Sequence, residues 1–541
     1  MADTMRGVYT NLTEIRRKVF AEVAKICYAS ADNPDWTDED FDRRFEELPY
    51  DIVPGDIATY RESVFLERAI VMERLRLAMG MDQQGVDRPL PLSEGLRDAM
   101  VNDTYYNPPL INVIKFACNA CKDNTYQVTD SCQGCLAHPC VEICPKDAIS
   151  FYNKRAVIDQ EMCIKCGRCE KTCPYHAIHH YVRPCAEACG MKAIGSDEHG
   201  RADINYDKCV SCGQCLINCP FGAIADKSQI AQVIFSIVGG DEVIAIVAPA
   251  FVGQFGGKGN VGKLRNAFAQ LGFAGVEEVA LGADLCAVEE ADDFIEEVPE
   301  HIPFMGTSCC PAWSSMAKME FPKYANCISM ALTPMVLTAR MVRARRPNAK
   351  IVFVGPCSAK KLEAMRESVR SEVDFVLTFE EMAGMMSAKD IDYLSLEDDD
   401  KSDFDTASAD GRLFAVAGGV ANAVVHALKD RYPDREVKVL NAEGLNDCRA
   451  MLKEAAKGTY DGYLLEGMAC PGGCVAGAGT LQPISKSTAA VKRYATRSPY
   501  EHVVDNSYRS LIRFLELDEE GSFPEETAAA IEEAEAAKKD V

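Results

Sequence analysis

The sequence predicts an α/β fold for the C-terminal half of the chain, preceded by a small cysteine-rich α+β module and a helical N-terminal segment. From about residue 240 onward, β-rich apolar runs such as EVIAIVAPAF and KIVFVGPC alternate with helical segments such as KLRNAFAQLGF. Of the 25 cysteines in the chain, sixteen fall between Cys118 and Cys219. Before residue 110, apolar residues recur at helical spacing.

These patterns divide the 541 residues into four parts. We expect a helical segment at 1–110, a cysteine-rich domain at 111–228, an α/β domain at 229–517 and an acidic tail at 518–541. Cys27 lies on an apolar helical stripe, which indicates a buried structural thiol. The tail is expected to be an exposed acidic helix or a frayed end.

Composition argues against several classes of partner. The 58 Lys and Arg residues against 82 Asp and Glu give a formal net charge of −24. Such a surface repels phosphate backbones and anionic lipids, so we expect no nucleic-acid and no membrane partner. No apolar run approaches the ~20 residues that span a bilayer, and the N-terminal sequence turns polar too early for a signal peptide. We therefore predict a cytoplasmic protein, where clustered cysteines hold metal more often than disulfides.

Two regular cysteine motifs indicate iron-sulfur clusters. The pattern C-x2-C-x2-C-x3-C-P occurs at 163–174 and again at 209–220. A tight loop of this spacing presents three thiolates to one cubane, while the fourth points to a neighbouring cluster. A looser run at 132–145 pairs naturally with the first motif. Zinc knuckles and disulfides are the alternatives, but zinc does not need the trailing proline and the repeated rhythm.

The motif at 209–220 pairs with two half motifs that are separated in the sequence. Cys118 and Cys121 lie before the two runs at 132–145 and 163–174, and Cys185 and Cys189 lie after them. We therefore expect one two-cluster unit to be nested inside another. The four cubanes would be held by Cys132, Cys135, Cys140 and Cys173; by Cys163, Cys166, Cys169 and Cys144; by Cys118, Cys121, Cys185 and Cys219; and by Cys209, Cys212, Cys215 and Cys189. The segment resembles polyferredoxin electron-transfer modules, which implies a ferredoxin-like 4x[4Fe-4S] domain that passes single electrons.

Three further motifs lie in the C-terminal half, each after a β-like run. They are TSCCPAW at 307–313, GPCSAKKLE at 355–363 and EGMACPGGCVAGAG at 466–479. Their cysteines could converge on a fifth cubane. Buried small thiols without a metal would explain one such loop but explain three poorly.

These motifs, in this order, resemble the three signatures of the iron-only, or [FeFe], hydrogenases, and the similarity covers roughly residues 111–515. The resemblance implies an α/β catalytic domain of two lobes that reduces protons to H2 or oxidises H2. It also implies an H-cluster, in which a cubane is joined through Cys474 to a two-iron subsite carrying carbon monoxide, cyanide and dithiolate ligands. Maturation enzymes and a ferredoxin or flavodoxin-type electron carrier are the implied partners. The implied cubane ligands are Cys310, Cys357, Cys470 and Cys474.

The resemblance also assigns roles around the two-iron subsite. Lys360 matches a lysine paired with a cyanide, whereas Lys361 is expected at the surface. Met468 matches a methionine packed on the subsite. The loop over the other cyanide is matched by Ala248, Pro249 and Ala250.

A proton route is expected at Cys309, which adjoins a cluster ligand without being needed as one. A thiol can relay protons around neutral pH when a carboxylate stands behind it. Glu290, Asp293 and Ser329 fall where the family places acidic groups and a serine in its relay. A solvated acidic face is the alternative interpretation of the run EEADD.

Several positions depart from the resembled pattern and predict a divergent subgroup. Gly355 stands where many members have Met, GAG replaces GGG at 477–479, and Ala312 follows Pro311. Two other functions stay open: a related family that works in iron-sulfur assembly, and an H2-sensing regulator. Retention of Cys309, Lys360 and Met468 disfavours the first, and the lack of an evident sensor domain disfavours the second.

A glycine-rich run at 257–262 matches G-x-G-x-x-G. It lacks the Ser or Thr of a P-loop and the acidic residue of a dinucleotide site, so we expect no nucleotide cofactor.

Overall fold

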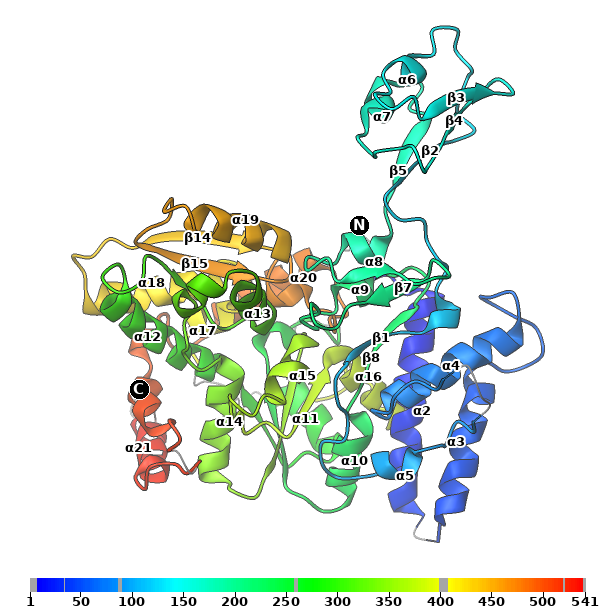
Figure 1. The fold of residues 1–541 in the computed structure, drawn as a ribbon. Coiled ribbons are helices and arrows are strands. Elements are labelled where there is room, and N and C mark those ends of the chain that lie inside the picture. Colours follow the sequence, from blue (N-terminus) through cyan, green and yellow to red (C-terminus); the bar gives the residue numbers. More distant parts are fainter. Residues whose placement is uncertain are drawn as a thin grey trace.

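The computed structural model describes residues 7–33, 35–85, 90–256, 261–397, 407–518 and 521–538. N-terminal helices lie on one side of the molecule, the α/β domain on the other, and the cysteine-rich segment between and above them (Figure 1). The first four residues of the glycine-rich run at 257–262 lie outside the described residues.

A four-stranded parallel sheet forms the centre of the α/β domain. Its order is β10 (Gly275–Glu278), β9 (Val243–Val247), β12 (Lys350–Gly355), β13 (Phe375–Thr378). All five residues of β9 are buried. Such a continuous apolar run is typical of parallel strands that are covered on both faces. The strands expected from EVIAIVAPAF and KIVFVGPC are therefore confirmed.

A second parallel sheet carries the other two cysteine motifs. Its order is β11 (Met305–Gly306), β15 (Tyr463–Met468), β14 (Lys438–Glu443). Four helices belong to this region (Figure 1): α12 (Ala280–Glu297), α13 (Pro311–Glu320), α18 (Gly419–Arg431) and α19 (Leu445–Ala455). Because the carboxyl ends of parallel strands share an edge, the loops after β11 and β15 leave the sheet on the same side.

The N-terminal segment is helical, as expected, and packs on the α/β domain. Its helices are α2 (Asn11–Asp32), α3 (Asp38–Ile52), α4 (Val64–Ala78) and α5 (Leu96–Ala99). Helix α2 lies against α10 (Ile230–Val238) and α16 (Phe379–Ala388). Cys27 is fully buried in this contact region, which confirms a buried thiol. Within the described ranges no helix has both the length and the apolar character needed to cross a membrane.

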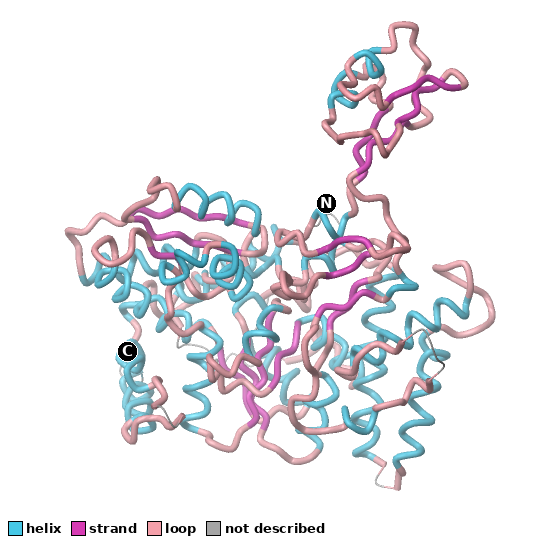
Figure 2. The backbone as a smooth tube through the Cα atoms, viewed as in Figure 1, coloured by secondary structure: helices cyan, strands magenta, loops and turns pink. Residues whose placement is uncertain are grey.

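The cysteine-rich segment folds as two small β-units. One contains the pairs β2 (Thr125–Val128) with β5 (Ile178–Tyr181) and β3 (Ile149–Tyr152) with β4 (Arg155–Ile158), and it projects from the molecule (Figure 2). In the other, β1 (Ile111–Val113) pairs with β8 (Ile224–Asp226), and β6 (Ile194–Ser196) pairs with β7 (Ala202–Ile204). The projecting unit is thus inserted between strands of the other one. Short helices carry cysteines in both: α6 (Pro139–Glu142), α7 (Arg168–Thr172), α8 (Pro184–Glu187) and α9 (Gln214–Asn218).

The acidic tail is a helix with one buried face. Helix α21 (Thr527–Lys538) packs on η6 (Ser507–Phe514) and α14 (Pro334–Arg345). Ile531 and Ala534 are buried there, and Arg345 forms an ion pair with Glu535 at 2.9 Å. Solvation alone therefore does not account for this segment.

A buried lysine joins three parts of the molecule. Lys361 is fully buried, and its Nζ donates to Asp226 Oδ2 and Glu381 Oε1, each at 2.9 Å. Asp226 ends β8 of the cysteine-rich segment, and Glu381 lies on α16, which contacts the N-terminal helix α2. Burial alone would lower the pKa of Lys361, but the two carboxylates raise it. The expected surface position of Lys361 is therefore wrong, because its charge is compensated inside the protein.

We expect the substitution Lys361→Met to lower the free energy of unfolding by about 3 to 5 kcal/mol, because it leaves two buried carboxylates without their cation. Denaturant unfolding of the full chain measures the effect. Lys457, whose surface pair with Glu454 is largely exposed, offers a matched control in Lys457→Met, which should change little. If the two substitutions lowered the free energy of unfolding equally, the ion pairs of Lys361 with Asp226 and Glu381 would not be important for stability.

Candidate functional site

One cavity gathers the cysteines of all three C-terminal motifs. Cys310 is the N-cap of α13, Cys357 follows β12, Cys470 follows β15, and Cys474 begins η4 (Cys474–Ala476). All four side chains line the same cavity between the two sheets. Four thiols around one enclosed space are a donor set suited to an iron-sulfur cluster.

The other residues expected around this cluster line the same cavity. Met468 and Cys309 lie in its wall, as does the loop after β9, formed by Ala248, Pro249 and Ala250. Most of the remaining wall is apolar and was not anticipated from the sequence; it includes Ala283, Met335, Phe353 and Phe414. This lining keeps the space dry, which strengthens electrostatic interactions inside it.

Among the described residues that line this cavity, Lys360 alone carries an ammonium group. Its Nζ donates to Thr333 Oγ1 at 3.0 Å and pairs with Glu363 Oε2 at 2.5 Å. Burial lowers the pKa of Lys360, but Glu363 reverses that effect, so the pKa lies above its ordinary value. A buried ammonium group, paired with Glu363, therefore lies in the wall of the cavity.

Two departures from the resembled pattern are matched by neighbouring residues. A Cβ atom on Gly355 would lie 2.4 Å from the ring of Phe353, which itself lines the cavity. Ala478, the extra methyl in GAG, packs where Gly213 of the cysteine-rich segment leaves room: a Cβ on Gly213 would lie 2.5 Å from the Cβ of Ala478. Each change is thus accommodated by a local partner.

Two of the four expected cysteine groups line small cavities of their own, and some members of the other two lie near one another. Cys118, Cys121, Cys185 and Cys219 line one small cavity, and Cys144, Cys163, Cys166 and Cys169 line another. In the third group, burial raises the pKa of Cys140, and the nearby thiols of Cys173 and Cys135 raise it further. In the fourth group, burial raises the pKa of Cys212 to about 12, with smaller contributions from Cys189 and Cys209.

One hydrogen bond recurs in all four groups. The backbone N–H of an alanine donates to the sulfur of the cysteine four residues earlier, at Cys144 (3.3 Å), Cys173 (3.4 Å), Cys189 (3.4 Å) and Cys219 (3.3 Å). Hydrogen bonds to sulfur are a known means of tuning iron-sulfur clusters. The run CAEACGMKAI therefore shares the local geometry of the regular motifs.

A buried carboxylate stands behind Cys309. Glu290 Oε1 accepts from the Ser308 N–H at 2.6 Å and from the Ser308 hydroxyl at 2.9 Å. Burial raises the pKa of Glu290 to about 7. Burial also raises the pKa of the Cys309 thiol, and the charge of Glu290 adds to that effect. Glu290 can therefore hold a proton close to a thiol that faces the cavity.

Ser308 is a functional candidate that the sequence reasoning missed. Its hydroxyl lies within hydrogen-bond distance of both Glu290 Oε1 and the Ala331 carbonyl, at 2.9 and 3.0 Å. A hydroxyl donates one hydrogen bond and can also accept hydrogen bonds. Ser308 can therefore donate to Glu290 when that carboxyl is ionised and to the Ala331 carbonyl when it is protonated. Its position directly before Cys309 in TSCC was the only available signal.

Further acidic groups continue along α12 towards the surface. Burial raises the pKa of Glu289 to about 7, and nearby Asp293 raises it further. Asp293 is partly exposed, and burial also raises its pKa. Ser329 is buried, and its Oγ accepts from the Ala331 N–H at 3.1 Å, so it joins the Ser308 region through Ala331. Glu289 is the second residue in this path that sequence reasoning did not single out.

The raised pKa of Glu290 predicts a pH-dependent stability. Because the pKa is about 7 in the folded chain against 4.5 ordinarily, the stability from this group is present at low pH and lost as pH rises through 7. The free energy of unfolding of Glu290→Gln, measured relative to that of the parent, should therefore rise by about 2 to 3 kcal/mol between pH 5 and pH 8. Parallel melting curves of the two proteins at both pH values are the measurement. If the difference in stability between the two proteins were the same at pH 5 and pH 8, Glu290 would not titrate in this range.

Comparison with known protein families yields two matches. Residues 241–478 match the family model described as the iron only hydrogenase large subunit, C-terminal domain. Residues 131–182 and 180–230 match the model of the LdpA Fe-S cluster-binding domain.

Curated relatives extend these matches. Iron hydrogenase 1 of Clostridium pasteurianum is 30% identical over 389 residues, which cover 62% of this chain and 67% of the relative. The NADP-reducing hydrogenase subunit HndD of Solidesulfovibrio fructosivorans is 28% identical, over 59% of this chain and 63% of the relative. The nuclear prelamin A recognition factor of Homo sapiens is 25% identical, over 44% of this chain and 64% of that protein. The chain thus spans about two thirds of the length of these relatives.

Proposed function

This chain belongs to the iron-only hydrogenase family, and from that membership we propose that it interconverts protons, electrons and H2 at an H-cluster. One observation carries the proposal. Cys309, Lys360 and Met468, together with the four cysteines of the three motifs, line a single apolar cavity. A protein that only bound a cubane would need the four thiols but neither the buried cation nor the thiol with a carboxylate behind it.

The side chains present suit the proposed cofactor. Cys310, Cys357, Cys470 and Cys474 would hold the cubane, and Cys474 would bridge to the two-iron subsite. The protonated Lys360 would face a cyanide ligand, with Met468 packed against the subsite. When bound, the H-cluster supplies the irons at which protons and electrons combine. The protein excludes water through the apolar wall and keeps one positive charge in place.

Protons would reach the cavity through the path that ends at Cys309. Asp293 and Glu289 lie on the outer part of α12. Glu290 Oε1 accepts two hydrogen bonds from Ser308, so a proton on this carboxyl would sit on Oε2. A carboxyl with a pKa of about 7 gives and takes protons readily at neutral pH. The Cys309 thiol would then carry the proton into the cavity.

Electrons would arrive through four accessory cubanes in the cysteine-rich segment. Cys212 belongs to one proposed ligand set and also lines the catalytic cavity. Gln214, on α9, donates from Nε2 to Cys470 Sγ at 3.2 Å. This contact supports electron transfer from the nearest accessory cluster, and the projecting unit would meet a ferredoxin or flavodoxin-type carrier (Figure 1).

A second candidate function is the role in iron-sulfur assembly named in the sequence analysis, and the similarity to the nuclear prelamin A recognition factor shows that not every relative is named as a hydrogenase. Under that alternative the chain would bind cubanes and take part in iron-sulfur assembly without turning over H2. An H2-sensing regulator with slow turnover is a third possibility. The retained Cys309, Lys360 and Met468 favour the hydrogenase.

Iron content and infrared spectra of the matured protein test the proposal. Five cubanes and a two-iron subsite predict about 22 irons per chain, and protein made without the maturation enzymes should hold about 20. Infrared bands in the carbonyl and cyanide region should appear only after maturation. Their absence from a protein with fully loaded cubanes would favour the assembly function. About 12 irons without the subsite would instead contradict the nested arrangement of accessory clusters.

The role of Cys309 is tested by substitution. Cys309→Ala removes the thiol but no cluster ligand, so iron content and infrared bands should persist while H2 turnover falls at least about 100-fold. Cys309→Ser should fail similarly because a hydroxyl is a far weaker acid, whereas Cys309→Asp should recover part of the rate. Cys27→Ala, which removes a buried thiol from the N-terminal helices, is the matched control. Near-parent H2 evolution by Cys309→Ala would move the proton path elsewhere.

A further inference from the structure

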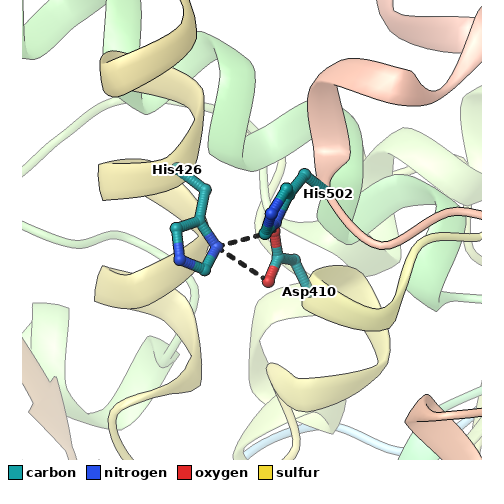
Figure 3. Close-up of side chains that lie close together, drawn as sticks. All are labelled: Asp410, His426 and His502. Atoms are coloured by element: carbon teal, nitrogen blue, oxygen red, sulfur yellow. Dashed lines mark hydrogen bonds and ion pairs between the residues drawn. The ribbon is translucent and has the colours of Figure 1, made fainter. Parts of the chain in front are cut away.

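We propose that Asp410, His426 and His502 bind one divalent transition-metal ion of the zinc class, at a site separate from the catalytic cavity. The three side chains come from α17 (Ala409–Leu413), from α18 and from the residue before η5 (Val503–Asp505), and they point toward one another (Figure 3). Their ligand atoms all lie within 4.8 Å of one another.

The distances suit a shared ion. His426 Nδ1 lies 3.0 Å from Asp410 Oδ1 and 2.9 Å from Oδ2, and His502 Nδ1 lies 3.0 Å from the same Oδ2. Zinc binds histidine nitrogen at about 2.0–2.1 Å and carboxylate oxygen at about 2.0–2.2 Å, so two such ligands of one ion lie roughly 3.0–3.4 Å apart. Small outward shifts of the rings therefore make room for an ion among the three groups.

The chemistry of the donors selects the class of ion. Two imidazoles and one carboxylate suit zinc and similar first-row ions, whereas magnesium and calcium prefer all-oxygen sites and iron-sulfur clusters prefer thiolates. Asp410 is buried, but the side chains of His426 and His502 are 35% and 39% exposed. The exposed side admits the ion and leaves space for a water as a fourth ligand.

A second layer of hydrogen bonds holds the backbone on both sides of this cluster. Asp284 is buried on α12. It accepts from the N–H and hydroxyl of Ser408, which precedes the segment of Asp410, and from Nδ2 of Asn506, which follows the segment of His502. Backbone bonds from Ala409 to Tyr500 and from Asp410 to Glu501 join the same two segments. Supporting hydrogen bonds of this kind hold the segments that carry the three ligands in place.

Such an ion would fasten the C-terminal segment to the wall of the catalytic cavity. His502 belongs to the segment after residue 495, whereas Asp410 lies on α17. The residues directly after α17, Phe414 and Ala415, line the cavity. The site would therefore stabilise the wall and would take no part in the chemistry inside the cavity.

The test uses the full chain with its iron-sulfur clusters loaded, so that free cysteines do not capture zinc. After incubation with Zn²⁺ and gel filtration, the parent should retain about one zinc per chain. X-ray absorption at the zinc edge should show nitrogen and oxygen at about 2.0–2.1 Å, without sulfur at about 2.3 Å. Zinc should also raise the melting temperature by at least about 2 °C, and a chelator should reverse the rise.

Substitutions separate this site from adventitious binding. His426→Ala with His502→Ala should lower retained zinc at least tenfold and abolish the melting shift, whereas His301→Ala, at an exposed histidine away from the cluster, should behave as the parent. Equal zinc in the double variant and the parent, or sulfur around the ion, would overturn the proposal. So would a parent that retains no zinc, which would leave a hydrogen-bonded histidine–aspartate cluster. If the double variant does not fold, the absorption spectrum and melting shift of the parent still decide. None of these readouts depends on H2 turnover.

Discussion

The arrangement of the molecule depends on bringing four thiols from three distant loops into one dry cavity. Each loop leaves the carboxyl end of a parallel strand or starts a short helix there, so the two sheets must face each other at those ends. Trp313, the fully buried last residue of the first motif, packs directly on Gly467 of the second sheet, where any Cβ would collide with its ring. The motif residues that flank the cysteines therefore serve packing as much as metal binding.

Burial around the cavity disfavours the ionised form of nearby carboxyl groups. Burial raises the pKa of Glu290, Glu466 and Asp284 each to about 7, and every one of them is held by backbone or side-chain donors. Glu466 accepts from the N–H groups of Gly418 and Ala421 at 2.6 and 2.8 Å. A set of acids that titrate near neutrality is common around sites that move protons. Only Glu290 among these three stands behind the Cys309 thiol.

The two units of the cysteine-rich segment differ in how closely they join the α/β domain. In the inner unit, Gly213 fits against Ala478, and Gly190 fits against Leu445, where a Cβ would lie 2.5 Å from the leucine Cβ. The projecting unit extends away from this contact (Figure 2). An inner unit in contact with the α/β domain and an outer unit that projects from it would suit the proposed stepwise electron transfer.

The sequence alone determined the local features whose cause is local. Strands and helices followed from apolar periodicity, and two of the expected cysteine groups, which line cavities of their own, followed from the cysteine motifs, because a short loop fixes where its own thiols point. It could also place Cys309, Lys360 and Met468 near the cluster by resemblance. Tertiary structure decided what depends on distant partners: the burial of Lys361 between Asp226 and Glu381, the hydrogen bonds from Ser308 to Glu290, and the meeting of Asp410, His426 and His502. Solvent exposure and the neighbours across a fold set the charge state of a side chain, and a linear motif carries neither.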